Sequence, residues 1–308
     1  MRKVLSAITI ILFSCDFLAS QQLPNYSLYN WNRFVLNPAF SCLQDSSEIR
    51  LSYRNQWNGF SANPSTINAG GFGQFGNGLG FSGFVIKDQT GGAYSQLAMQ
   101  LAFSKYLMLN QDTRIGFGLG LSLSQLSFDN SIMQLIQADD PSFPIGIQRS
   151  MIPDASVGFY LQDRNLSVGF GANQLFQNKV NSFASVNQVQ PRLSRHYYLH
   201  GSYRIQLKSD FSLIPSMMLA QMNNSELQAT IQLGAEFNTF VTVGLNMQVG
   251  VGPSVFFQFN RKKINFGYCY DIPGGALQNY YSGSHELVFG YFIGGGKEEV
   301  KQSVSDQD

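Results

Sequence analysis

The chain has 308 residues, of which only 13% are Asp, Glu, Lys or Arg, and its formal net charge is +1. Soluble globular proteins carry about 25% of these charged residues, yet the mean hydropathy here is only −0.08. A net charge this small excludes the strong field that attracts nucleic acid or acidic substrates. The composition instead suits a sheet with one apolar face and one uncharged polar face.

The first residues have the features of a secretory signal. A basic pair, Arg2 and Lys3, precedes the apolar run 4–13, and small residues around Ser20 suit cleavage. The apolar run is too short to span a membrane as a helix. Residues 1–20 are therefore predicted to be a signal peptide. A loose lipobox that ends at Cys15 leaves acylation of that cysteine as the alternative.

Residues 21–47 show no strand period but are rich in aromatic side chains. Two interpretations are open: a small plug packed in the mouth of a barrel, or an ordered periplasmic lead-in. The segment also contains Cys42, which could form a disulfide with Cys269 in an oxidising compartment or stay an unpaired thiol.

Residues 48–294 repeat the alternation of a β-strand, in which every second side chain lies on the same face. Leu or Phe alternates with Gly or Ser over 115–124, and Val, Leu or Met alternates with Thr, Gly, Asn or Gln over 241–250. The segments are longer than the roughly 5 or 6 residues usual in globular strands. They match the roughly 9 to 11 residues that cross a membrane.

Strands that face lipid must close into a barrel, because lipid cannot satisfy a free edge. The sequence therefore predicts an all-β fold, a transmembrane antiparallel β-barrel of about fourteen strands, with apolar side chains toward lipid and small polar side chains toward the lumen. The predicted strands are 48–57, 64–75, 78–87, 93–106, 112–127, 153–163, 165–175, 193–208, 210–220, 225–237, 239–250, 252–261, 263–271 and 283–293.

Connections of two kinds separate these strands. Asp163-Arg164, Asn223-Asn224 and 261–263 are predicted to be tight turns. The long connections 128–152, 176–192 and 272–282 are predicted recognition surfaces, if they face outward, since external loops of such barrels are longer than periplasmic turns. The polar, charged residues 295–308 are predicted to be a disordered tail.

Several short strings resemble the PorP/SprF family, and they occur in family order over residues 37–292. They are Asn37-Pro38-Ala39-Phe40, Tyr53-Arg54-Asn55-Gln56-Trp57, Gly59-Phe60 with Pro64 and Thr66, Gly78-Leu79-Gly80, Asp140-Pro141-Ser142-Phe143, Arg195-His196-Tyr197-Tyr198, Gly267-Tyr268 with Tyr270-Asp271, and Gly283-Ser284-His285-Glu286. The charged tail after the last strand departs from the family pattern.

The resemblance implies a barrel in the outer membrane of a Gram-negative, Bacteroidetes-type bacterium, with a fold similar to that of the fatty-acid transporters. It also implies a role in type IX secretion and gliding. Expected partners are secretion-machine subunits or one large, adhesin-like secreted client, together with outer-membrane lipid and no nucleic acid. The resemblance does not separate a role in the core machine from service to a single adhesin.

No catalytic set, cofactor site or metal site is evident, and the chain is predicted not to be an enzyme. His196 and His200 share a strand face but lie about 13 Å apart, too far to chelate one metal directly. Ser284 and His285 are adjacent on a strand and point to opposite faces, so their adjacency does not make a hydrolase site.

The candidate contact residues are therefore structural or partner-binding. Arg54 and Gln56 share one strand face, predicted to be lumenal, while Tyr53 and Trp57 lie on the other, at the lipid headgroups. The alternative is a wall that orders the N-terminal segment or contacts a partner. The full candidate set is Asn37, Pro38, Phe40, Tyr53, Arg54, Gln56, Trp57, Asp140, Pro141, Arg195 and His196.

Two functions remain open from the sequence: an assembly protein of type IX secretion, or a channel for hydrophobic or small solutes. They differ in the lumen, because a channel needs a continuous path. Whether the lumen is open or plugged does not follow from the sequence.

Overall fold

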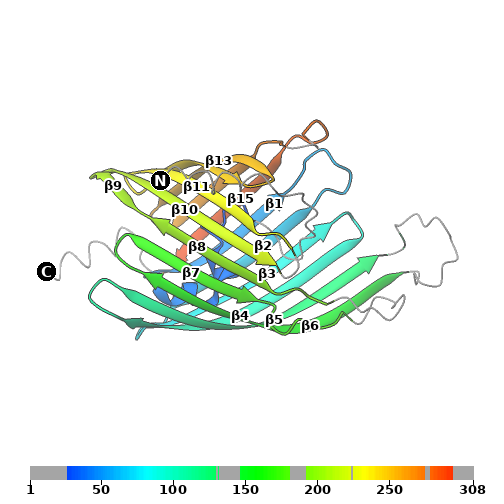
Figure 1. Ribbon diagram of the computed structural model, residues 1–308, viewed down its shortest axis with the longest axis horizontal. Coiled ribbons are helices and arrows are strands. Elements are labelled where there is room, and N and C mark those ends of the chain that lie inside the picture. The colour runs from blue at the N-terminus through cyan, green and yellow to red at the C-terminus, as the bar shows by residue number, and fades with distance from the viewer. Residues whose placement is uncertain are drawn as a thin grey trace, which may run out of the picture.

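The computed structural model describes residues 26–129, 131, 146–180, 192–222, 225–274 and 278–293. Its strands form one antiparallel sheet, in which neighbours along the chain pair with each other, apart from one interrupted strand described below (Figure 1). The last strand pairs with the first over Ser47–Asn55, which closes the sheet into a barrel. The predicted barrel is thus confirmed. No helix in the described ranges is long and apolar enough to cross a membrane.

The strand bounds follow the alternation seen in the sequence, within a few residues in most cases. The strands are β1 (Ser47–Asn55), β2 (Ser65–Gln74), β3 (Leu79–Thr90), β4 (Tyr94–Met108), β5 (Arg114–Asp129), β6 (Ile147–Gln162), β7 (Leu166–Asn173), β8 (His196–Tyr203), β9 (Ile205–Lys208), β10 (Phe211–Met222), β11 (Gln228–Phe237), β12 (Val241–Gln248), β13 (Gly252–Arg261), β14 (Ile264–Asp271) and β15 (Ser284–Ile293). Strands β8 and β9 both pair with β10 and are interrupted only at Arg204. They form one wall strand, so the barrel has the predicted fourteen.

One strand begins earlier than predicted. β6 starts at Ile147 rather than at residue 153, because Pro153 does not end it. The carbonyl of Pro153 accepts a hydrogen bond from Asn178 Nδ2 at 2.6 Å, on the side away from β5. The missing N–H of an extended residue lies on the same side as its carbonyl, so Pro153 removes no hydrogen bond from the β5–β6 ladder.

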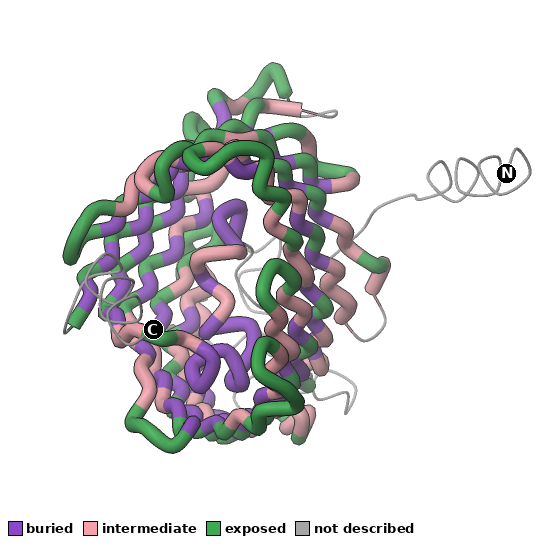
Figure 2. The backbone as a smooth tube through the Cα atoms, turned by 90° about the vertical axis from the view of Figure 1, so that its left-hand side faces the viewer, coloured by how far each residue is buried: buried purple, intermediate pink, exposed green. Residues whose placement is uncertain are grey.

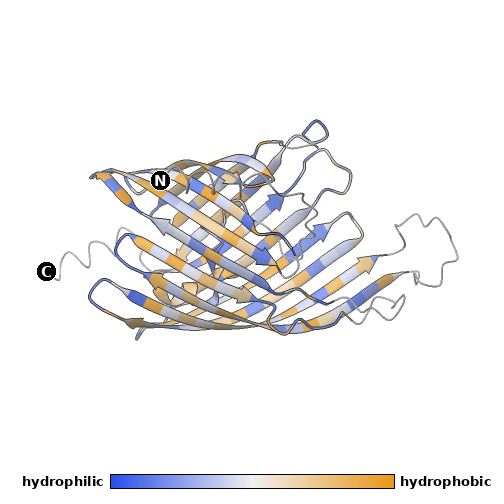
Figure 3. Ribbon diagram, in the orientation of Figure 1, coloured by the Kyte–Doolittle hydropathy of each residue, from blue (hydrophilic) through white to orange (hydrophobic). Residues whose placement is uncertain are grey.

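The two faces of the barrel have opposite chemistry, and hydrophobic and hydrophilic residues alternate along the strands in Figure 3. On β5, Leu119 and Leu121 are 68% and 73% exposed and lie on the outer surface. The intervening Gly118 and Gly120 are buried on the lumenal face. This is the apolar exterior that contact with lipid requires.

The two ends of the barrel differ in their connections. At one end, called here the short-turn end, the strands are joined by 75–78, 109–113, 163–165, 209–210, 238–240 and 262–263. The other, long-loop end carries 56–64, 130–146, 174–195 and 272–283. The turn predicted at Asn223-Asn224 and most of the loop 130–146 lie outside the described residues, as do residues 1–25 and 294–308.

Residues 26–43, called here the inner segment, lie within the barrel (Figure 2). They contain the short helix α2 (Arg33–Leu36) and the 3-10 helix η1 (Pro38–Leu43). Most of their side chains are buried, and Tyr29, Phe34 and Leu43 are at most 1% exposed. With lumenal side chains such as Phe72 and Tyr160 they form the hydrophobic core of the molecule.

Candidate functional site

The inner segment runs along the lumen from one end of the barrel toward the other. Ser27 contacts Asp271 and Glu286, at the long-loop ends of β14 and β15. The carbonyl of Cys42 accepts a hydrogen bond of 2.9 Å from Gln74, at the short-turn end of β2. The chain then enters β1 at Ser47. The inner segment therefore lies against the inside of the barrel wall and is not a lead-in outside the barrel.

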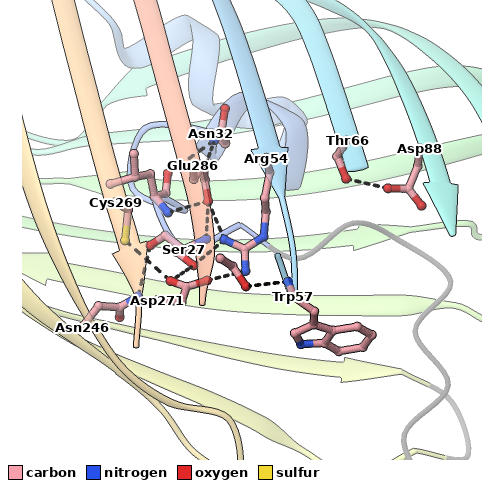
Figure 4. A network of polar contacts seen from close by, with 12 residues as sticks. Ser27, Asn32, Arg54, Trp57, Thr66, Asp88, Asn246, Cys269, Asp271 and Glu286 are labelled. Carbon is pink, nitrogen blue, oxygen red and sulfur yellow. Dashed lines mark hydrogen bonds and ion pairs between the residues drawn. The ribbon is translucent and has the colours of Figure 1, made fainter. Parts of the chain in front are cut away.

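A buried charge cluster holds the beginning of the inner segment (Figure 4). Arg54 on β1 pairs with Asp271 Oδ2 at 2.7 Å and with Glu286 Oε2 at 3.0 Å. The hydroxyl of Ser27 donates to Asp271 Oδ1 at 2.7 Å and accepts from Arg54 Nη1 at 2.5 Å. We call Ser27, Arg54, Asp271 and Glu286 the charged anchor, since it joins the inner segment to three wall strands.

The charged anchor holds two carboxylates against one guanidinium, and all three groups are at most 8% exposed. The second negative charge, on Glu286, is stabilised by hydrogen-bond donors of the inner segment. Backbone N–H groups of Ser27 and Leu28 donate to Glu286 Oε2 at 2.7 and 3.3 Å, and Asn32 Nδ2 donates to Oε1 at 3.4 Å. Hydrogen bonds to a charged acceptor are about twice as strong as neutral ones. The buried charge therefore depends on the inner segment being in place.

A second cationic contact lies deeper in the lumen. Arg50 on β1 pairs with Glu48 at 2.5 Å, and its guanidinium carbon lies 5.7 Å from the ring centroid of Trp31 and 6.0 Å from that of Phe34. A guanidinium within about 6 Å of an aromatic ring is attracted by the electron density of its face. Arg50 thus binds the middle of the inner segment.

Glycines on the wall make room for the second half of the inner segment. Cross-strand pairing places Gly80, Ser104, Gly118, Gly158 and Gly171 side by side, in that order, across β3 to β7. We call these residues the glycine row. A Cβ at any of its four glycines would lie within 3.0 Å of the inner segment, mostly of its backbone. The 3-10 helix η1 therefore lies in a groove that exists because the glycines on the wall have no side chains.

The Asn37-Pro38-Ala39-Phe40 string lies in this groove and shapes the turn into η1. Asn37 Oδ1 accepts a hydrogen bond from the N–H of Ala39 at 2.9 Å, and Asn37 Nδ2 donates to the carbonyl of Phe159 on β6 at 2.9 Å. Pro38 occupies the first helical position, where an N–H would have no partner. Phe40 packs edge-on against Phe72 and Tyr160.

Between the inner segment and the wall lies an open cavity of about 330 Å³ at the short-turn end, called here the vestibule. Its lining includes four arginines, Arg33, Arg50, Arg164 and Arg204, and three carboxylates, Glu48, Asp163 and Glu236. Neutral polar side chains fill much of the remaining surface. The exposed lining is more polar than apolar, although Trp31, Phe72 and Phe256 also contribute to it.

The remaining candidate residues that the structure describes contribute no side chain to this site, although the N–H of Trp57 donates to Ser284 Oγ at 3.1 Å, beside the charged anchor (Figure 4). Tyr53 is 42% exposed on the outer face, Gln56 follows the end of β1, and Trp57 takes a positive φ of 52° in the adjoining turn. Arg195 and His196 lie on the opposite wall, where they hydrogen-bond the 174–175 stretch. Asp140 and Pro141 lie outside the described residues.

The residues that the sequence interpretation missed are Ser27, Asp271 and Glu286, together with the glycine row. Asp271 and Glu286 do occur in the family strings near the end of the chain, and that is the one signal that could have found them. Cys42 and Cys269 are each buried and free, so no disulfide links them.

Solved structures with a similar fold are outer-membrane barrels. The toluene transporter TodX of Pseudomonas putida matches with a TM-score of 0.50 and 9% identity, covering 84% of this chain and 92% of its own. The monoaromatic hydrocarbon channel CymD matches with a TM-score of 0.50 and 11% identity, over the same shares of the two chains. Identities this low show the fold alone.

Among curated proteins no match was found. The sequence matches the family described as type IX secretion system membrane protein PorP/SprF over residues 18–291. That match spans the inner segment and every strand up to β15, so it includes the charged anchor and the glycine row. The chain belongs to the PorP/SprF family of type IX secretion system membrane proteins.

Proposed function

We propose that this protein is an outer-membrane assembly component of type IX secretion in a Bacteroidetes-type bacterium. It binds other subunits of the machine, a large secreted client, or both, and catalyses no reaction. The observation that carries the proposal is the inner segment, which occupies the lumen and is fixed there by the charged anchor.

The energetics of the anchor favour a closed barrel. Removing the inner segment would leave Glu286 buried without the donors of Ser27, Leu28 and Asn32. Glu286 would keep only its ion pair with Arg54, which also serves Asp271. Each hydrogen bond lost from this carboxylate is about twice as strong as a neutral one, so a solute does not readily displace the segment. A barrel that stays plugged uses its outer surfaces, and the long loops and short turns are where partners would bind.

The alternative is a channel for hydrophobic or small solutes. It is favoured by the likeness of the fold to TodX and CymD, whose names describe them as a transporter and a channel for aromatic hydrocarbons. The mainly polar lining of the vestibule argues against a hydrophobic cargo.

The test is affinity purification of the full-length protein from outer membranes in mild detergent, with mass spectrometry of what accompanies it. We expect known secretion subunits or one very large secreted protein in stoichiometric amounts. The same preparation is placed in liposomes to measure solute entry, and we expect none above that of empty vesicles. Isolation of the barrel alone, together with rapid solute entry, would establish the channel instead.

A further inference from the structure

The vestibule contains one cation that differs from its neighbours. Arg50 pairs with Glu48, Arg164 pairs with Asp112, and Arg204 forms a two-pronged pair with Glu236. Arg33, on the inner segment, forms no ion pair with any carboxylate among the residues that the structure describes. Counted over its lining, the vestibule carries four arginines against the three carboxylates of Glu48, Asp163 and Glu236, so one positive charge is in excess.

The partners of Arg33 are all neutral oxygens. Nη1 donates to the hydroxyl of Tyr160 at 2.8 Å and to Ser167 Oγ at 3.2 Å, Nη2 donates to Ser202 Oγ at 3.1 Å, and Nε donates to Asn30 Oδ1 at 3.1 Å. A hydroxyl that accepts from a guanidinium still has its own proton to donate. Ser167 and Ser202 use one such proton between them, in a hydrogen bond of 2.7 Å. Among the residues that the structure describes, no acceptor takes the proton of the Tyr160 hydroxyl or of one of the two serine hydroxyls, so both can donate to an anion.

A third donor in the same network is unused. Asn30 Nδ2 donates to Gln232 Oε1, and both residues line the vestibule. Gln232 is only 3% exposed, yet its Nε2 has no hydrogen-bond partner among the described residues. A buried amide without a partner costs about 1–3 kcal/mol, and a bound oxygen would remove that cost.

Unused acceptors lie in the same cavity. Gln162 Oε1 and Asn265 Oδ1 are buried and without partners in the described part of the chain, and both residues line the vestibule. Gln162 is two residues beyond Tyr160 on the same face of β6, or about 7 Å along the strand. Acceptors at that distance from an anion site suit a ligand that has N–H groups close to its negative charge. A peptide with an acidic side chain has both groups.

We propose that the vestibule is a binding site for an acidic peptide segment. Its carboxylate is held by the hydroxyls of Tyr160 and Ser167 or Ser202, with the charge of Arg33 behind them and Gln232 Nε2 beside them. Its backbone N–H groups are accepted by Gln162 and Asn265. The vestibule opens at the short-turn end, which faces the periplasm in barrels of this kind, so the peptide enters from that side. The volume of about 330 Å³ is at the small end of the range of ligand pockets.

The test uses the full-length protein in detergent micelles and a short fluorescent peptide with adjacent glutamates, alongside its glutamine twin. Binding is followed by fluorescence anisotropy. We expect the acidic peptide to bind roughly tenfold more tightly than the twin, as one charged hydrogen bond predicts. Arg33→Gln should abolish the difference, and Tyr160→Phe should reduce it with less risk to folding. Arg261→Gln is the matched control and should preserve it, because Arg261 is exposed at the end of β13 and does not line the vestibule.

Folding of each variant is checked by its heat-dependent shift on a denaturing gel. Equal binding of the two peptides to the folded wild-type protein overturns the proposal. So does an acidic peptide that binds no more tightly than acetate or inorganic phosphate in competition, because the site would then hold a small free anion. A failed search for secretion partners leaves this measurement unaffected, since it needs no other subunit.

Discussion

Arg54 and Glu286 are direct cross-strand partners in the β1–β15 ladder that closes the barrel, and their side chains form an ion pair of 3.0 Å. The same carboxylate accepts the backbone N–H of Ser27 at 2.7 Å. One buried group therefore links closure of the barrel with the position of the inner segment. A substitution in this ion pair should therefore lower the stability of the barrel and displace the inner segment from the lumen at the same time.

Replacing Arg54 by methionine should destabilise the barrel strongly. The variant leaves Asp271 and Glu286 buried without a cation, and breaking a buried pair in this way costs about 3–5 kcal/mol. The measurement is urea unfolding in lipid vesicles, followed by tryptophan fluorescence. Arg164→Gln is the control, since Arg164 pairs with Asp112 at the surface and its side chain is 74% exposed. We expect no measurable change there, and equal effects of the two substitutions would refute the role of the anchor.

Adding a methyl group to the glycine row should displace the inner segment. A Cβ on Gly158 would collide with Asn37 and with the backbone of Ala39. We expect Gly158→Ala to cost about 1–3 kcal/mol, as overpacking of a tight core does, and to raise ion conductance across planar bilayers. Gly201→Ala is matched to it, because there the nearest atom to the added carbon is 3.5 Å away. A Gly158→Ala barrel with wild-type stability and conductance would show that the groove is not needed.

The thiol of Cys42 should report the position of the inner segment. Burial raises the pKa of Cys42, so in the native protein it stays a protonated and shielded thiol at pH 8, and only the thiolate reacts with maleimide. We expect negligible labelling of native wild-type protein and complete labelling after denaturation. Labelling of Cys42 should increase in Gly158→Ala but not in Gly201→Ala. A Cys269→Ser background assigns the label to Cys42, and fast labelling of native protein would place the segment outside the lumen.

The barrel could be predicted from the sequence because its cause is local. Alternation along a strand such as 115–124 depends on which face meets lipid, and each strand carries that signal on its own. The strand start that differs most from the prediction is that of β6, which begins six residues before Pro153. The missing N–H of Pro153 is harmless only because it points away from β5, and that orientation is not encoded in the local pattern.

The site could not be predicted because its causes are not local. Ser27 and Glu286 are 259 residues apart. Each glycine of the glycine row looks like any small lumenal residue, and only the register of the wall brings Gly118, Gly158 and Gly171 together. The sequence therefore left the plug and the lead-in as equal alternatives, whereas tertiary pairing places residues 26–43 inside.

The outer surface gives the most direct test that this barrel spans a membrane. Leu121 is 73% exposed near the middle of β5, whereas Leu109, 60% exposed, lies in the turn between β4 and β5. A charge at the bilayer midplane costs about 2–4 kcal/mol and one near the interface about 0–1 kcal/mol. Leu121→Arg should therefore lower the free energy of unfolding in vesicles far more than Leu109→Arg. In detergent micelles, which adapt to the charge, the difference between the two variants in free energy of unfolding should be smaller. Two leucines of similar exposure that respond alike in vesicles would mean that β5 does not cross the lipid.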